Sequence, residues 1–380
     1  MKVAPYGATF FYVLQSICKT IFSMLRIFSS ALLFVFSFNA FGQGVGIPSK
    51  TSGIGFGNLP RFSGIRFNFA DKRVKKISGI NFTVWQAKQD SLQTGTMSGI
   101  SLGLPLAMGT DSRSGITLGA LGAGARSQMT GINVGGLGVG AGGSIKGINL
   151  GGLGIGSGGD LKGINIGGLG AGSGGNVSGM NFGGLGIGAG GDLSGFTFGG
   201  LGAGAGDDVK GIIIGGLGVG AGGDVKGLSI SGIGLGAGGD LKGINIAGIG
   251  LGAGGSVSGL AIAGVGVGSP TLKAIVIAPA VAAIEVKGLV IAPAYLQVGS
   301  KNSKWEKSGV NDPVIKGIAI SAYNNIRGEQ KGLTIGVFNY AQKQKGFQLG
   351  ILNYVKDNPR GLRLLPIFNT RFGKRNESTD

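Results

Sequence analysis

The chain has 380 residues, of which 85 are glycine and only 10 are proline, and its formal net charge at pH 7 is +18. Glycine shows no three-residue period, which excludes collagen, and 42% apolar residues at regular spacing exclude a disordered Pro/Gly tract. There is no histidine and a single cysteine, Cys18, so the usual residues of zinc sites, catalytic triads and histidine acid–base chemistry are missing. We therefore expect no metal site, no cofactor and no enzyme activity.

Residues 1–42 are predicted to be a secretion signal. Arg26 precedes a short apolar run, and the small residues Ala40 and Gly42 then form a cleavage sequence. The segment before Met24 is long for the start of a signal, so we expect translation from Met24 and cleavage after Gly42. The alternative for this segment is an uncleaved N-terminal anchor. The predicted mature chain contains no cysteine, which suits export to an oxidising compartment.

Glycine-led repeats follow the predicted signal. Residues 43–98 form divergent first repeats with larger side chains, as an array needs where its end would otherwise be exposed. Residues 99–273 repeat one 16-residue sequence without a slip. Shortened repeats at 274–372 contain a polar insertion at 299–314, and a polar tail occupies 373–380.

One repeat predicts two short β-strands. In GINIGGLGAGSGGNVS (163–178), numbered from its opening glycine, apolar residues occupy positions 2 and 4, then 7 and 9. A spacing of two is typical of a strand, and the glycine content excludes a helix. Because the alternation changes phase between positions 4 and 7, we expect a corner at positions 5 and 6. This model places Ile166 and Leu169 inside and Asn165 outside.

Two strands, a corner and a closing turn make one coil of a β-solenoid, and we expect an all-β repeat protein of about 19 coils. Each position would stack on its own copy about 4.8 Å away in the next coil. The alternative is a transmembrane β-barrel with one strand of about 10 residues per repeat and glycine facing its lumen. Uniform turns and a lumen lined by glycine, which fills nothing, favour the solenoid.

The C-terminal repeats GLTIGVFNYAQKQK, GFQLGILNYVKDNP and GLRLLPIFN, with the glycine-rich core, resemble a family of secreted bacterial envelope proteins called surface-repeat proteins. The hallmark of that family is a G-[LVI]-Q-[IL]-G-L-[VI]-N-type repeat of 14 to 16 residues, often closing on an LLPIFN-like segment. The resemblance covers nearly all of residues 64–372. It implies an exported protein at the cell surface or outer membrane of a Gram-negative bacterium. Members mostly lack an assigned function, so the resemblance supplies no site residues.

Two motifs invite other interpretations. The G-x-G-x-x-G spacing of dinucleotide-binding loops recurs in consecutive repeats with no helix-forming run after it, so we interpret it as repeat glycine. Aspartate follows glycine at position 14 of several repeats, as in calcium-binding nonapeptide rolls. The 16-residue spacing, and the Asn or Ser found there in other repeats, favour a turn-capping role instead. These aspartates are Asp160, Asp192, Asp208, Asp224 and Asp240.

Position 16 is basic in most repeats, so lysines should follow one edge of the solenoid, where their fields add. Aspartates at position 14 should cancel much of this charge up to Lys273, beyond which they stop. We therefore expect the C-terminal third to bind anionic envelope polysaccharide or lipopolysaccharide, and not nucleic acid. The alternative is that these lysines only keep an apolar edge soluble and block strand pairing. The candidate residues are Lys316, Lys331, Lys343, Lys345, Lys356, Arg360 and Arg363.

The sequence as a whole favours an exported structural or adhesive repeat protein of the bacterial cell envelope. Association with the outer membrane is compatible with it. A second interpretation is an outer-membrane barrel that acts as a pore. An enzyme ranks third, because the acidic and basic loop clusters of polysaccharide lyases on secreted β-helices are missing. The sequence does not specify the oligomeric state.

Overall fold

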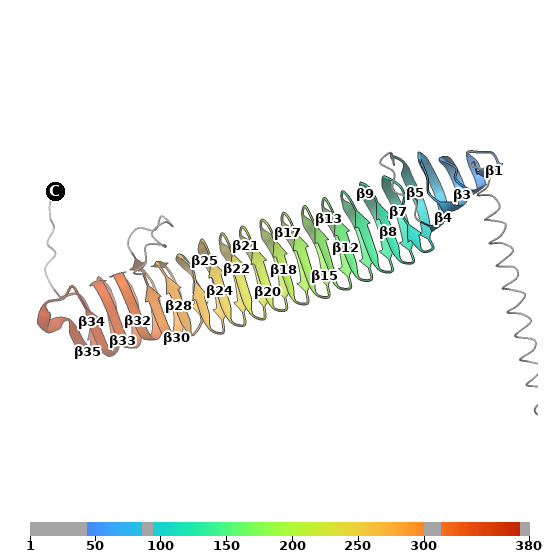
Figure 1. Ribbon diagram of the computed structural model, residues 1–380. Coiled ribbons are helices and arrows are strands. Elements are labelled where there is room, and N and C mark those ends of the chain that lie inside the picture. The colour runs from blue at the N-terminus through green and yellow to red at the C-terminus, as the bar shows by residue number, and fades with distance from the viewer. Residues whose placement is uncertain (1–43, 86–93, 300–312, 373–380) are drawn as a thin grey trace, which may run out of the picture. The chain divides into compact units, whose positions relative to one another are not determined.

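The computed structural model describes residues 44–85, 94–299 and 313–372 (Figure 1). The predicted signal with its Met24 start, most of the polar insertion and the polar tail lie outside the described residues. The chain forms a parallel β-solenoid of about 17 turns, slightly fewer than the about 19 expected, and not a barrel. It divides into two compact units, an N-terminal unit that ends at Gly136 and a C-terminal unit that begins at Leu137.

The N-terminal unit is a stack of parallel strands that begins with an antiparallel one. β1 pairs antiparallel with β2, whereas β2, β3, β4, β5, β7 and β9 pair in parallel, each with the next. An antiparallel strand thus covers the edge of the first coil, in keeping with the capping role expected of divergent first repeats. The strands are β1 (Val45–Pro48), β2 (Ser52–Phe56), β3 (Arg61–Ala70), β4 (Lys76–Trp85), β5 (Thr96–Gly103), β6 (Leu106–Ala107), β7 (Ser112–Gly119), β8 (Gly122–Ala125) and β9 (Gln128–Gly135).

A buried ionic cluster occupies the interior of these first coils. Asp71 lies between two buried arginines: Arg66 Nη1 donates to its Oδ1 at 2.9 Å, and Arg113 Nη2 is 3.6 Å from its Oδ2. The side chains of Asn81 and Thr83 also donate to Oδ2 of Asp71. Burial lowers the pKa of both arginines, and the negative charge of Asp71 opposes that shift. The cluster links β3, β4 and β7 through one carboxylate.

The C-terminal unit begins with glycine-rich coils, residues 137–273, in which each coil contributes one long and one short strand (Figure 1). The long strands are β11 (Ile145–Gly151), β13 (Leu161–Gly167), β15 (Val177–Gly183), β17 (Leu193–Gly199), β19 (Val209–Gly215), β21 (Val225–Ser231), β23 (Leu241–Ala247), β25 (Ser256–Ala263) and β27 (Thr271–Ile277). The short strands are β10 (Gly138–Ala141), β12 (Gly154–Ser157), β14 (Gly170–Ser173), β16 (Gly186–Ala189), β18 (Gly202–Ala205), β20 (Gly218–Ala221), β22 (Gly234–Ala237), β24 (Gly250–Ala253) and β26 (Gly266–Gly268).

Like residues stack on like residues, as the repeat predicts. In the ladder of long strands Asn149 pairs with Asn165, and in the ladder of short strands Gly154 pairs with Gly170, both in parallel. Each repeat therefore supplies two strands to two parallel ladders. A barrel would take one strand from each repeat, so this pairing is the direct evidence for the solenoid.

The prediction of which side chains face inward is wrong. Asn165 is 0% exposed, whereas Ile166 is 40% and Leu169 is 50% exposed. The same arrangement repeats through the glycine-rich coils, where positions 2, 4 and 7 lie outside and positions 3, 5, 9 and 15 are buried. The long strand is in the opposite phase to the one expected from burial of its isoleucines.

The narrow interior explains this inversion. Inward positions 5 and 11 mostly hold Gly, Ala or Ser, and larger aliphatic side chains are mostly confined to positions 9 and 15, such as Ile155 and Leu161, with Ile213 at position 3 an exception. The isoleucines of positions 2 and 4 would add two further rows of large side chains, for which the space between the long-strand and short-strand ladders is too narrow. Three of the asparagines inside bond to one another: Nδ2 of Asn149 donates to Oδ1 of Asn165, and Nδ2 of Asn165 to Oδ1 of Asn181, both at 2.8 Å.

The corners of each coil lie one residue later than predicted. The bend between the two strands comes at positions 6 and 7, as at Gly168 and Leu169, so that the leucine sits on the corner itself. The opening glycine is required by the backbone: Gly163 has φ of 114°, and a Cβ there would overlap the carbonyl oxygen of Gly147 in the preceding coil.

The C-terminal coils, residues 274–372, have longer strands and a more polar interior. Nδ2 of Asn324 donates to Oδ1 of Asn339 at 2.7 Å, and Asn339 donates likewise to Asn353. The last strand, β35, pairs antiparallel with β34 and caps this end. The elements are β28 (Ala280–Ala283), β29 (Glu285–Val286), β30 (Leu289–Val298), β31 (Val314–Ile315), β32 (Ile318–Gln330), β33 (Leu333–Gln344), β34 (Phe347–Val355), the 3-10 turn η3 (Arg360–Leu362) and β35 (Leu364–Asn369).

Candidate functional site

The outer face of the C-terminal coils is basic at one side and apolar across the rest. Alternate residues of a strand share a face, so Lys331, Leu333, Ile335 and then Val337 at the corner follow one another on the outside of one coil. Neighbouring coils repeat this order, for example from Lys345 to Ile351. One row of lysine therefore runs beside three apolar rows.

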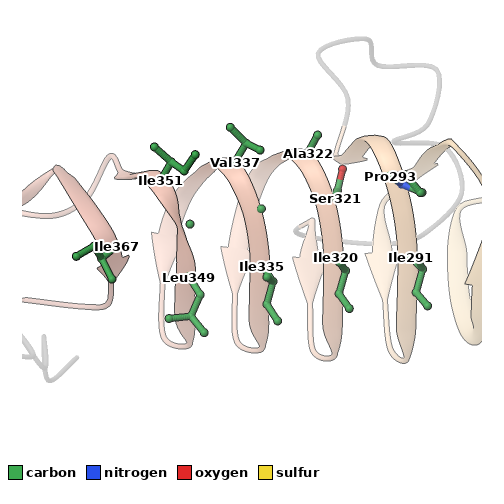
Figure 2. Close-up of a pocket in the computed structure, with 12 residues that line it drawn as sticks. Ile291, Pro293, Ile320, Ser321, Ala322, Ile335, Val337, Leu349, Ile351 and Ile367 are labelled. Atoms are coloured by element: carbon green, nitrogen blue, oxygen red, sulfur yellow. The ribbon is translucent and has the colours of Figure 1, made fainter.

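Two of the apolar rows line an open groove of about 720 Å³. Figure 2 shows Ile291, Ile320, Ile335 and Leu349 along one side and Pro293, Ala322, Val337 and Ile351 along the other, with Ile367 of β35 at the end. The remaining lining residues are Ser321, Gly336 and Gly350. The groove crosses five strands, which at a spacing of about 4.8 Å makes it about 19 Å long.

The groove offers almost no hydrogen-bonding groups. Ser321 has the only polar side chain in its lining, and Oγ of Ser321 already donates to the carbonyl oxygen of Tyr323 at 3.1 Å. Four of the five strands beneath the groove, β30, β32, β33 and β34, pair with a neighbour on both sides, so their backbone groups are used in the ladders, whereas β35 at its end pairs with β34 alone. A ligand of the groove must therefore be apolar.

The lysine row is partly neutralised by two glutamates. Glu285 lies 2.6 Å from Lys287 and 3.7 Å from Lys316, and Glu329 lies 2.9 Å from Lys331 and 2.5 Å from Lys345. Burial would raise the pKa of Glu329, but hydrogen bonds from both lysines outweigh it and hold that pKa below its ordinary value. The aspartates of position 14 stop beyond Lys273 as expected, but Glu285 and Glu329 take the equivalent place two residues before the lysine, so acidic partners continue into the C-terminal coils.

The other candidate cations lie nearer the end of the array. Lys343, Lys356 and Arg360 are exposed, and within the described residues they make no salt bridge. Lys343 lies two residues before Lys345, at the place where earlier coils have an acid, and it pairs in the ladder with Glu329. Arg363 is half-buried and its Nε donates to the carbonyl oxygen of Asn358 at 2.9 Å, so it stabilises the turn before β35.

The glycine-rich coils carry equal numbers of positive and negative side chains. Residues 137–273 carry six lysines and six aspartates, and four of these lysines pair with aspartates along one edge. Lys226, for example, bridges Asp208 at 3.4 Å and Asp224 at 2.9 Å. The five aspartates at position 14 also cap the turn of the next coil: Oδ1 of Asp208, for example, accepts the backbone N–H of Asp224 at 2.8 Å. The predicted turn-capping role is confirmed.

The structure thus brings Lys316, Lys331 and Lys345 into one row and places the other four candidates around the last coil. The sequence did not predict the groove, since it assigned the apolar rows to the interior. It also passed over a basic loop of the N-terminal unit between β3 and β4, where Lys72, Arg73, Lys75 and Lys76 are all exposed. A run of four cations within five residues was the available signal.

Within the described ranges, no group of three or more Cys, Asp or Glu side chains is placed to hold a metal ion. That part of the chain also lacks a helix of the length and apolarity needed to span a bilayer. No protein family model matches the chain, and no curated protein or solved structure is significantly similar to it.

Proposed function

We propose that the protein is an exported structural or adhesive repeat protein of the Gram-negative cell envelope, without catalytic activity. It acts by binding anionic envelope polymers, polysaccharide or lipopolysaccharide, through its C-terminal coils. The resemblance to surface-repeat proteins and the predicted signal support the location. The alternative function, an outer-membrane pore, requires a β-barrel, whereas the chain forms a solenoid.

The excess of cations over the C-terminal coils carries this proposal. Their described residues contain ten Lys or Arg and three acidic residues, against six of each in the glycine-rich coils. The cations repeat at the spacing of the coils, about 4.8 Å, which is below the screening length of about 8 Å in the cell, so their fields add. A polymer with regularly spaced negative charges meets several of them at once.

Chromatography on an immobilised anionic polysaccharide tests the binding. We expect retention at low salt, elution as salt is added, and earlier elution after combined Lys343→Gln, Lys356→Gln and Arg360→Gln substitution. The matched control is Lys162→Gln with Lys226→Gln and Lys242→Gln, cations that already have aspartate partners. Retention that is insensitive to salt, or equal loss in both variants, contradicts the proposal. Protease shaving of intact cells, followed by membrane fractionation, tests the location separately.

A further inference from the structure

We propose that the groove of the C-terminal coils takes the acyl chains of an anionic membrane lipid, so that this face docks on the surface of an anionic bilayer. The inference deepens the proposed function, and rests on it for the envelope location, by naming a lipid as the ligand of this face. Three observations point to it: the apolar lining, the charge beside it and the protrusion of two side chains.

The lining selects an acyl chain over a peptide. A peptide strand would need free backbone partners or polar side chains, and over β30, β32, β33 and β34 the groove has neither, since these strands are paired on both sides and the hydroxyl of Ser321 is engaged. Burying peptide groups there without partners costs free energy. Hydrocarbon has no such requirement.

The charge beside the groove selects an anionic headgroup. The lysine row lies four residues along the strands from the row of Ile320 and Ile335, or about 13 Å. Four lysines share two glutamates, so this edge keeps a positive excess, which Lys343 increases. A lipid phosphate at the lysine row would have three apolar rows beside it, which in one coil are Leu333, Ile335 and Val337. From lysine to corner these rows extend about 20 Å, comparable with the half-thickness of a bilayer's hydrocarbon core, about 15 Å.

Protruding side chains distinguish this end from the glycine-rich coils. Ile367 and Ile351 are 74% and 67% exposed, more than any other large apolar residue in the described ranges. The glycine-rich coils also expose apolar rows, but aspartates there match the lysines one for one. The C-terminal coils combine protruding apolar side chains with a row of lysines that exceeds its acidic partners, the combination that favours binding at an anionic membrane interface.

A site-specific probe tests insertion in the full chain. In a Cys18→Ser background, an environment-sensitive fluorophore is attached to the cysteine introduced by Ile351→Cys. The matched control is Leu169→Cys, an exposed corner position of the glycine-rich coils. With phosphatidylcholine vesicles that contain phosphatidylglycerol, we expect a blue shift at position 351 and none at 169. Adding Lys316→Gln, Lys331→Gln and Lys345→Gln should raise the lipid concentration at half-saturation about tenfold.

Each other outcome overturns the inference in a distinguishable way. Vesicle binding without a shift at 351 means attachment by charge alone. An equal shift with pure phosphatidylcholine removes the role of the headgroup. A shift that needs no vesicles and grows with protein concentration means that a second copy of the chain covers the groove. Retention on the polysaccharide column without vesicle binding refutes the lipid and leaves the proposed function standing, whereas failure in both assays refutes both.

Discussion

The side-chain amide of Asn149 donates a hydrogen bond to the amide oxygen of Asn165, one coil further on, at 2.8 Å and out of contact with solvent. The next bond, from Asn165 to Asn181, has the same length. This ladder sets the phase of the long strand. With asparagine inside, positions 2 and 4 must lie outside, and the protein presents isoleucine to its surroundings.

The asparagine ladder predicts that replacing one asparagine lowers the unfolding free energy by more per residue than replacing three neighbouring asparagines together. Asn165→Val removes the bond from Asn149 and takes away the donor to Oδ1 of Asn181, and should cost about 2 kcal/mol of unfolding free energy. Replacing Asn149, Asn165 and Asn181 together by valine should cost less per residue, as the chain already buries Ile213 in this row. Urea unfolding of both variants measures the difference. Equal costs per residue would show that the asparagines act independently.

The aspartate cap predicts a difference between two substitutions at one position. Asp208→Ala removes the acceptor for the backbone N–H of Asp224 and should cost about 1 kcal/mol. Asp208→Asn keeps an acceptor, as Asn176 does for Asp192, and should cost less. Unfolding midpoints of the two variants decide this. A cost as large for Asn as for Ala would assign the effect to the ion pairs with Lys210 and Lys226.

Acid should weaken the glycine-rich coils in a defined pH range. The backbone N–H of Asp224 lowers the pKa of Asp208 from 3.8 to about 2, and Lys242 lowers that of Asp240 to about 2. Since the folded state holds these pKa values below the unfolded ones, the stabilisation is complete above pH 3.8 and is lost as the pH falls towards 2. Thermal unfolding followed between pH 5 and pH 2 should show the decline, and it should be smaller in Asp208→Asn. A flat profile would contradict it.

Two glycines of the array should respond in opposite ways to alanine. Gly188, at position 10, has a normal backbone and nothing within 4 Å of an added Cβ, so Gly188→Ala should stabilise by about 0.5 kcal/mol. Gly163→Ala meets both a positive φ and the carbonyl oxygen of Gly147, and should cost about 2 kcal/mol or more. Melting temperatures of the two variants check this. Destabilisation by Gly188→Ala would mean that the outer glycines are required by the fold.

The period alone predicted much of the fold. A 16-residue repeat with strand spacing and a glycine-rich turn indicated parallel coils with like on like, and Asp208 and Asp224 cap their turns as expected. Glu285 and Glu329 could also have been recognised from the sequence, since each lies two residues before the lysine that ends its repeat, as the aspartates do in earlier repeats. The row of Lys316, Lys331 and Lys345 also followed from the period.

The phase of the long strand could not be predicted from apolarity. The rule that isoleucine is buried and asparagine exposed fails where the interior is too narrow for two further rows of large side chains. The signal was present at inward positions 5 and 11, as in Gly167 and Ser173, whose small side chains leave the sheets close together. The groove was missed for the same reason, since it is built from Ile335 and Val337, which were assigned to the interior.

Introducing one charge at two neighbouring positions tests the inversion most directly. We predict that Asn165→Asp, which buries a carboxylate inside the asparagine ladder, costs about 3 kcal/mol or more. Leu169→Asp, at an exposed corner, should change the unfolding free energy by about 0.5 kcal/mol or less. Urea unfolding of the two variants beside the parent gives both values. The opposite result, a severe loss with Leu169→Asp and little change with Asn165→Asp, would contradict the apolar outer face on which the lipid-binding proposal depends.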